Sequence, residues 1–137
     1  MPWGALRVEL VLSGWIFLML AADLLMAPAR KTRLWALALA GVAVAAGVLL
    51  WPPSSWGDGA FPGGFVSDPF SRYFKGLFLL TGAVVILMTR AFQRHLPANL
   101  GAFYLLLLSA LLGACVLASV SDLLTLFLGL ELLTFSL

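Results

Sequence analysis

Long apolar segments alternate with short polar connections along the whole chain. A membrane-spanning helix needs about 20 mostly apolar residues, because the hydrocarbon core is about 30 Å thick and each residue rises about 1.5 Å. This pattern predicts an all-α, polytopic integral membrane helix bundle with four complete transmembrane helices and most of a fifth. The chain, residues 1–137, is expected to form a single membrane domain. The expected spans are residues 5–27, 34–51, 69–90, 100–120 and 122–137.

The connection at residues 52–68 differs from the others because it is rich in Pro and Gly and contains no Lys or Arg. Within it, Pro62-Gly63 predicts a tight turn, which could close a small hairpin on the membrane surface. Asp68 can cap the helix that follows, and Pro69 suits its first position. Four positions separate Asp68 from Arg72, so the two side chains are expected to be neighbours.

The composition supports a membrane protein and excludes several other classes. Hydrophobic residues make up 63% of the chain and charged residues 10%, with a mean hydropathy of +1.08. A soluble domain carries about 25% charged residues. A secreted disulfide domain, a disordered tail and a nucleic-acid binder are therefore excluded. Cys115 is the chain's one cysteine, so no cluster of thiolates can form within it, and we interpret it as a packing residue.

The distribution of positive charge predicts the orientation in the membrane. Five of the eight cations follow the first and third apolar segments, namely Arg30, Lys31, Arg33, Arg90 and Arg94. Cytoplasmic loops carry such an excess of Lys and Arg. The N-terminus is therefore expected on the outer, periplasmic side. Because the strong charges follow the first apolar segment, we interpret that segment as a retained helix and not as a signal peptide.

Glu131 is the main candidate for chemistry. It lies nine residues beyond Asp122, which places it roughly 13 Å into the membrane. A carboxylate at that depth costs at least about 2.5 kcal/mol, so it must face a partner, a water cavity or a proton path. Gly129 leaves room beside it for a neighbouring helix or water. We interpret Glu131 as an intramembrane proton relay, with a structural ion pair as the alternative.

The other ionisable residues have two interpretations. Lys75, six residues into the third segment, either extends its long stem to the interface or takes part in charge pairing inside the membrane, which makes it a possible charge partner. Glu9 and Asp23 are interpreted as interfacial, Arg72 as an interface anchor and His95 as solvated. The sequence contains no metal-ligand spacing, no phosphate-binding loop and no candidate Ser-His-Asp set.

Small residues recur four positions apart in the two uncharged spans. Such pairs allow helix backbones to approach closely in lipid, so they predict packing faces. The pairs are Gly41 and Ala45, Ala43 and Gly47, and Ser109 and Gly113.

The run SDLLTLFLGLELLTFSL, Ser121 to Leu137, resembles the fifth transmembrane helix of the N-subunit family of bacterial respiratory NADH:quinone oxidoreductase (complex I). This family includes mitochondrial subunit 2 and belongs to the antiporter-like proteins. Residues 101–119 and 67–80 resemble the family at the corresponding places, whereas the first 66 residues agree in layout only. The sister L and M families are expected to have Trp immediately before this Glu, where Leu130 stands here. Relatives commonly have Glu at the position of Ala102.

The resemblance implies that Glu131 pairs with a Lys on the seventh helix and that the pair gates proton movement. That Lys would lie beyond Leu137, so we expect the chain to be an N-terminal part of a longer subunit. The fifth apolar segment has 16 residues and ends without a charged flank or cap, which favours the same interpretation.

By the same resemblance, the chain is a multi-pass, non-redox subunit of a proton-translocating NADH:quinone oxidoreductase in the bacterial inner membrane. It would bind no cofactor or metal, and NAD, FMN, iron–sulfur clusters and quinone would lie in other subunits. Its partners would be antiporter-like M-type and small K-, J- and A-type membrane subunits and lipid, with no nucleic acid. Two alternatives are a subunit of a multi-subunit cation/proton antiporter and a structural membrane scaffold in which Glu131 locks helices together.

Overall fold

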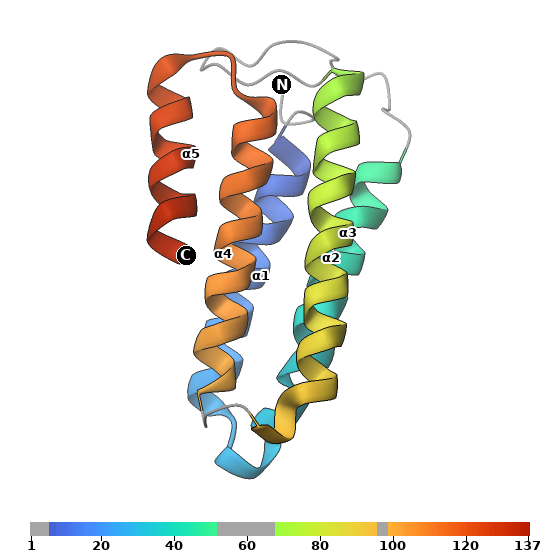
Figure 1. The fold of residues 1–137 in the computed structure, drawn as a ribbon, viewed down its shortest axis with the longest axis vertical. Coiled ribbons are helices and arrows are strands. Elements are labelled where there is room, and N and C mark those ends of the chain that lie inside the picture. Colours follow the sequence, from blue (N-terminus) through green and yellow to red (C-terminus); the bar gives the residue numbers. More distant parts are fainter. Residues whose placement is uncertain (1–5, 52–67, 96–98) are drawn as a thin grey trace.

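A computed structural model describes residues 6–51, 68–95 and 99–137. Five α-helices, shown in Figure 1, account for most of these residues; they are α1 (Arg7–Leu25), α2 (Leu34–Leu50), α3 (Pro69–Phe92), α4 (Leu100–Ser119) and α5 (Leu123–Ser136). Two 3₁₀ segments, η2 (Pro28–Arg33) and η3 (Gln93–His95), follow α1 and α3. Every helix begins and ends within two residues of its predicted segment. The turn predicted at Pro62-Gly63 lies outside the described residues.

The predicted fold class is confirmed. Among the described residues, four helical segments are long and apolar enough to cross a membrane, and they contain α1, α2, α3 and α4. The fifth helix, α5, is apolar but has only 14 residues. At about 1.5 Å per residue, α5 is shorter than the hydrocarbon core is thick.

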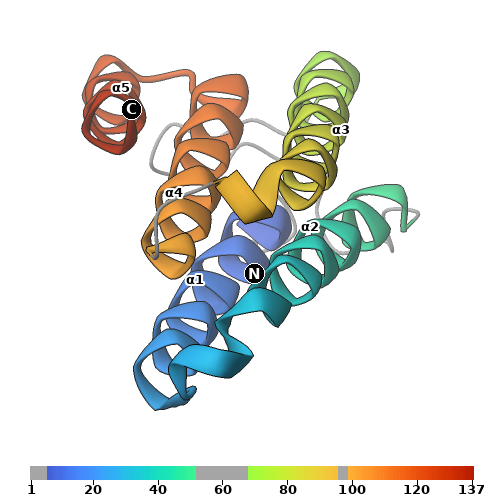
Figure 2. The ribbon, with the colours of Figure 1, turned by 60° about the horizontal axis from the view of Figure 1, so that its bottom comes forward.

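Helices α1 to α4 form an antiparallel bundle, and α5 packs outside it against α4 (Figures 1 and 2). We call the end of the bundle where α1, α3 and α5 begin and α4 finishes the upper end, as drawn in Figure 1. The opposite end, which carries η2 and η3, is the lower end. Segments that start at the upper end therefore bring their first residues together, although they lie far apart in the sequence.

Apolar side chains from α1, α2, α3 and α4 form the core. On α1, α3 and α4 the largest that are fully buried are Leu12, Met19, Leu79, Ile86, Tyr104 and Leu108. On each of these helices, the two buried residues are seven or four positions apart, so they lie on one face. Much of the outward surface consists of exposed Leu, Phe and Val, which suits helices surrounded by lipid.

One predicted small-residue pair lies at the contact between α1 and α2. Gly41 and Ala45 are buried, and the Trp15 ring occupies the space that a side chain at Gly41 would take. The indole Nε1 of Trp15 donates a hydrogen bond to the Leu37 carbonyl at 2.8 Å. The second predicted pair in α2 is wrong, because Ala43 and Gly47 face outward.

Helix α5 contacts α4 through small residues. A Cβ atom added to Gly113 would lie 2.9 Å from the Leu133 nitrogen and 3.2 Å from the Gly129 carbonyl oxygen, so the two backbones are in close contact. Buried Thr125 and Ser136 lie on the same inward face of α5 as Gly129. Gly113 is thus confirmed as a packing position, and Gly129 leaves room for α4 on the side of α5 opposite Glu131.

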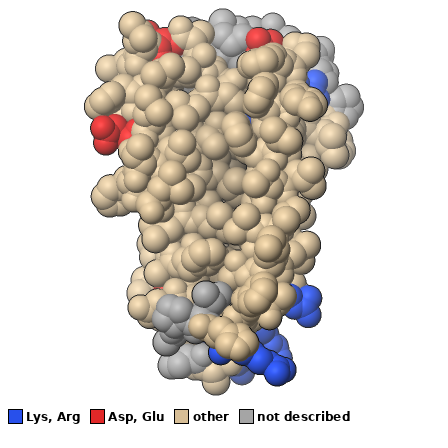
Figure 3. Space-filling view, viewed as in Figure 1, with Lys and Arg blue, Asp and Glu red and all other residues tan. Residues whose placement is uncertain are grey.

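The charges are unevenly distributed along the bundle. Figure 3 shows Lys and Arg gathered at the lower end, where Arg30, Arg33, Arg90 and Arg94 are exposed. The Arg90 guanidinium lies 4.0 Å from the centre of the Trp35 ring, a cation–π contact. The predicted clusters of positive charge after α1 and α3 therefore share one end of the molecule.

At the start of α3, Asp68 occupies the N-cap position and Pro69 the first turn, as predicted, but the Asp68 side chain makes no capping hydrogen bond. The expected contact between Asp68 and Arg72 is also not the one that forms. Nη2 of Arg72 donates instead to the Leu49 carbonyl at 3.0 Å. The last carbonyls of a helix lack partners within it and carry its negative dipole, which explains why the guanidinium turns to α2.

Candidate functional site

Glu131 lies in the middle of α5, on the side facing away from the bundle. Its side chain is exposed, and both ion pairs formed among the described residues involve other carboxylates. Its backbone carbonyl accepts a hydrogen bond from the Thr134 hydroxyl at 3.1 Å. The carboxylate thus projects from a helix that packs mainly on α4.

The surroundings of Glu131 on α5 are apolar. Phe127, Leu128, Leu130 and Phe135 are all exposed large hydrophobic residues of the same helix. A carboxylate on such a surface is compatible with a membrane only if another polar group or water covers it. The outward face of α5 therefore combines one ionisable group with side chains suited to helix packing.

A second carboxylate, Glu9, is buried inside the bundle. Glu9 belongs to the first turn of α1, and Lys75 lies in the second turn of α3. Only 5% of Glu9 and 3% of Lys75 is exposed. Lys75 Nζ lies 2.6 Å from Oε1 of Glu9, so the two charges form a buried ion pair between α1 and α3.

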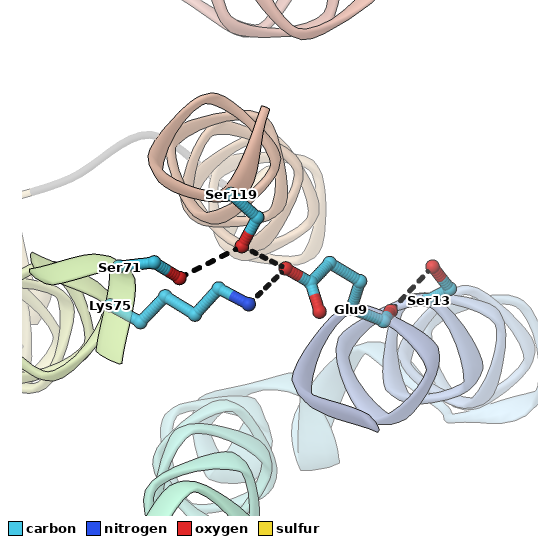
Figure 4. A network of polar contacts seen from close by, with 5 residues as sticks. All are labelled: Glu9, Ser13, Ser71, Lys75 and Ser119. Atoms are coloured by element: carbon cyan, nitrogen blue, oxygen red, sulfur yellow. Dashed lines mark hydrogen bonds and ion pairs between the residues drawn. The ribbon is translucent and has the colours of Figure 1, made fainter. Parts of the chain in front are cut away.

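Two serine hydroxyls extend this ion pair into a polar cluster, which Figure 4 shows from close by. The Ser119 hydroxyl, at the end of α4, donates to the same Glu9 Oε1 at 3.4 Å. The Ser71 and Ser119 hydroxyl oxygens are 3.2 Å apart, and either can be the donor. Because these four residues come from the upper ends of α1, α3 and α4, antiparallel packing brings them together.

The second carboxylate oxygen of Glu9 is not satisfied by the cluster. Oε2 is buried and has no hydrogen-bond partner among the described residues. In Figure 4 it points away from Lys75 and Ser119. A buried acceptor of this kind is costly unless water, a proton or another donor reaches it.

Glu9 lies near the helix end, as expected, but it is buried and paired, which the interfacial interpretation did not anticipate, and Lys75 pairs with it inside the bundle. The position of Glu9 along its own helix did not reveal its burial, because neighbouring helices cover the first turn of α1. A signal was nevertheless present in the sequence: opposite charges stand near the start of two helices that enter from the same side, and α2 between them has no ionisable residue. The charge partner of Lys75 among the described residues is Glu9, not Glu131.

The lower end carries a more exposed ion pair. Lys31 Nζ lies 3.2 Å from Oδ1 of Asp23, with 31% and 21% of the two side chains exposed. Asp23 thus lies near the helix end, as expected. Its carboxylate occupies the space next to Gly101 on α4, where no larger side chain would fit.

The remaining singled-out side chains have the predicted environments. His95 is exposed, and Cys115 is fully buried in the core. Within residues 6–51, 68–95 and 99–137, no group of three or more His, Cys, Asp or Glu side chains is arranged to hold a metal ion.

The sequence is similar to subunits of quinone-reducing complexes over nearly its whole length. It is 38% identical over 136 residues to NADH-quinone oxidoreductase subunit N of Anoxybacillus flavithermus, covering 98% of this chain and 27% of that protein. It is 36% identical over 132 residues to NAD(P)H-quinone oxidoreductase subunit 2 of a Synechococcus species, covering 95% of this chain and 25% of the relative. The subunit N of an Anaeromyxobacter species is 35% identical over 131 residues, which are 93% of this chain and 25% of that protein.

These matches confirm the resemblance that the sequence motifs indicated. They also extend it, because the similarity covers the first 66 residues as well as the second half of the chain. The chain spans about a quarter of the length of these curated relatives. No protein-family model matches the chain.

Proposed function

We propose that this chain, a homologue of part of NADH-quinone oxidoreductase subunit N, contributes to proton translocation by a membrane subunit of such a complex. Glu131 is the proton-carrying group of this part of the subunit. The observation that supports this proposal most is the position of an ionisable side chain on the apolar, outward face of α5.

Bilayer physics favours a proton-handling role for that position. A charged carboxylate near the membrane centre costs at least about 2.5 kcal/mol. Removal from water favours the protonated form, whereas a nearby cation favours the carboxylate. A carboxyl group that is first removed from water and then approached by a cation binds a proton and releases it again. The cation that would act on Glu131 belongs to a covering helix, since Lys75 is already paired with Glu9.

Electron transfer is assigned to other subunits of the complex. NAD, FMN, iron–sulfur clusters and quinone would be bound there. Quinone reduction in those subunits would be coupled electrostatically to proton transfer in this chain. The antiporter-like M-type and small K-, J- and A-type membrane subunits are its proposed partners. The positive-inside rule supports a bacterial inner-membrane orientation with the lower end in the cytoplasm and the upper end outside.

The test replaces Glu131 by Gln in the complete subunit within the assembled complex. Glutamine preserves size and hydrogen bonding but cannot ionise, so proton transfer through this subunit is expected to slow at least about tenfold, the effect of about 1.4 kcal/mol of added barrier. The measurement is the number of protons pumped per electron in closed membrane vesicles.

Asp122→Asn is the matched control, because Asp122 is exposed at the start of the same helix. Asp122→Asn removes a carboxylate at the start of α5 and leaves Glu131 in place, so this variant should pump normally. Normal pumping by Glu131→Gln with weakened assembly would favour the scaffold alternative and contradict the proposal. Sodium movement in place of proton movement would favour a cation/proton antiporter instead.

A further inference from the structure

We propose that the Glu9–Lys75 ion pair is a second protonatable site of the subunit, which takes up one proton at Oε2 of Glu9 when the pair opens and releases it when the pair closes. The site lies at the upper end of the bundle, between α1, α3 and α4. Its contribution to translocation rests on the proposed function, whereas its proton binding does not.

The geometry leaves one carboxylate oxygen free for the proton. Oε1 of Glu9 already accepts from Lys75 Nζ and from the Ser119 hydroxyl. Oε2 is buried and has no hydrogen-bond partner among the described residues. A proton from water would form an O–H bond at Oε2 and convert the carboxylate to a neutral carboxylic acid. The same bond breaks on release, and no oxidant or reductant takes part.

The position of Lys75 lets the pair open toward the upper end. Lys75 lies six residues after Pro69, the first residue of α3, which places its backbone about 9 Å from the start of the helix. A lysine stem is long and flexible enough to carry its ammonium group toward an interface from this depth. Once the ammonium has moved away, Glu9 is a buried carboxylate without a counter-charge, and such a group neutralises by binding a proton.

Two serine hydroxyls give the proton a path to Glu9. The Ser71 and Ser119 hydroxyls form a hydrogen-bonded chain to Glu9 from the third residue of α3 and the last of α4. A hydroxyl both donates and accepts, so it passes a proton without ionising. The chain ends at Oε1 of Glu9, so a proton that it delivers reaches the Oε2 position when the carboxyl group turns about its Cγ–Cδ bond. It connects the carboxylate with the ends of α3 and α4 at the upper end.

Among the residues that the structure describes, the elements packed around the pair contribute few other charged or titratable groups. Arg7 precedes Glu9 by two residues on α1, and Arg72, one turn before Lys75 on α3, donates to the Leu49 carbonyl. Cys115, buried one turn before Ser119, is the titratable group that α4 contributes, and α2 contributes none. The exposed Asp122 begins α5. Among the described residues, Lys75 is the cation that forms an ion pair with Glu9.

Infrared difference spectroscopy of the assembled complex after a pH step tests the proposal. We expect a protonated-carboxyl band that is absent in Glu9→Gln and unchanged in Asp23→Asn, a control that alters the other carboxylate paired with a lysine. In Lys75→Met the band should already be present before the pH step, because no counter-charge then stabilises the carboxylate. An unchanged spectrum in Glu9→Gln, or a Lys75→Met spectrum that titrates like the unmodified protein, would overturn the proposal.

The double variant Glu9→Gln/Lys75→Met keeps the proposal testable if single variants fail to assemble, because it leaves no unpaired charge in the bundle. It should assemble, lack the carboxyl band and pump fewer protons per electron than the Asp23→Asn control. An assembled double variant that retains the band overturns the second site. If Glu131→Gln pumps normally while the Glu9 band is confirmed, the proposed function fails and the second site stands.

Discussion

At the scale of single residues, two lysine–carboxylate pairs of the chain have very different surroundings. The Glu9–Lys75 pair is buried, whereas the Asp23–Lys31 pair remains partly exposed at the lower end. A buried pair is held by strong attraction but leaves a costly charge when one partner is removed. An exposed pair is screened by water and contributes little. The two pairs should therefore respond differently to substitution.

Removing the cation of the buried pair should destabilise the bundle. We expect Lys75→Met to lower the free energy of unfolding by about 3–5 kcal/mol, because Glu9 is left buried and unpaired. Replacing both residues, in Glu9→Leu/Lys75→Met, should recover most of that loss. Thermal unfolding of the purified full-length subunit measures both effects. Lys31→Met is the matched control, with an expected change of about 0–1 kcal/mol.

A Lys75→Met variant no less stable than Lys31→Met would contradict the buried ion pair. A double variant as unstable as the single one would show instead that the loss comes from packing at these positions and not from the loss of the counter-charge of Glu9.

At the scale of the helices, α5 is held mainly by its contact with α4. It packs on α4 through Gly129, Thr125 and Ser136, and its large apolar residues face outward. Glycine at position 113 of α4 allows the two backbones to meet. In lipid, close packing of small residues is a main source of helix association. The placement of Glu131 therefore depends on a small-residue contact on the opposite side of its own helix.

An added methyl group at this contact should displace α5. We expect Gly113→Ala to destabilise the subunit by about 1–3 kcal/mol, since its Cβ atom would meet the α5 backbone and α-helices cannot yield locally. Gly47→Ala is the matched control, because the space around that Cβ position is open. Thermal unfolding of the two variants compares them. Equal stability of Gly113→Ala and Gly47→Ala would show that the α4–α5 contact is looser than described.

At the scale of the whole molecule, the bundle is electrically asymmetric. Its exposed cations gather at the lower end, and the buried pair and its serines lie at the upper end. The proposed orientation, which follows the positive-inside rule, has the lower end in the cytoplasm. Under this orientation, the Glu9 site faces the outer side and Glu131 lies deeper in the membrane.

Labelling of single cysteines tests that orientation. In a Cys115→Ser background, we expect Ser121→Cys to react with a membrane-impermeant thiol reagent added to intact cells and His95→Cys to react only after the membrane is opened. Both positions are exposed, and His95 precedes α4 at the lower end whereas Ser121 follows α4 at the upper end. The reverse pattern would place the N-terminus in the cytoplasm and the Glu9 site on the inner side.

The sequence predicted the helices well because the bilayer imposes a length and an apolar composition on each of them. It also singled out Glu131 and the close approach at Gly113, since both depend on a residue's place within one helix. It misjudged Glu9, Arg72 and Gly47, whose surroundings are set by neighbouring helices. Burial near a helix end and the choice between two partners follow from three-dimensional packing and not from periodicity.

The central claim is that Glu131 works through a proton that it binds and releases. Its most direct test is the proton-to-electron ratio of the assembled complex in closed vesicles, compared between Glu131→Asp and Glu131→Gln. The aspartate variant keeps an ionisable carboxyl group and should retain part of the pumping, whereas the glutamine variant should lose the pumping of this subunit. Equal ratios in both variants and in the unmodified complex would contradict the claim.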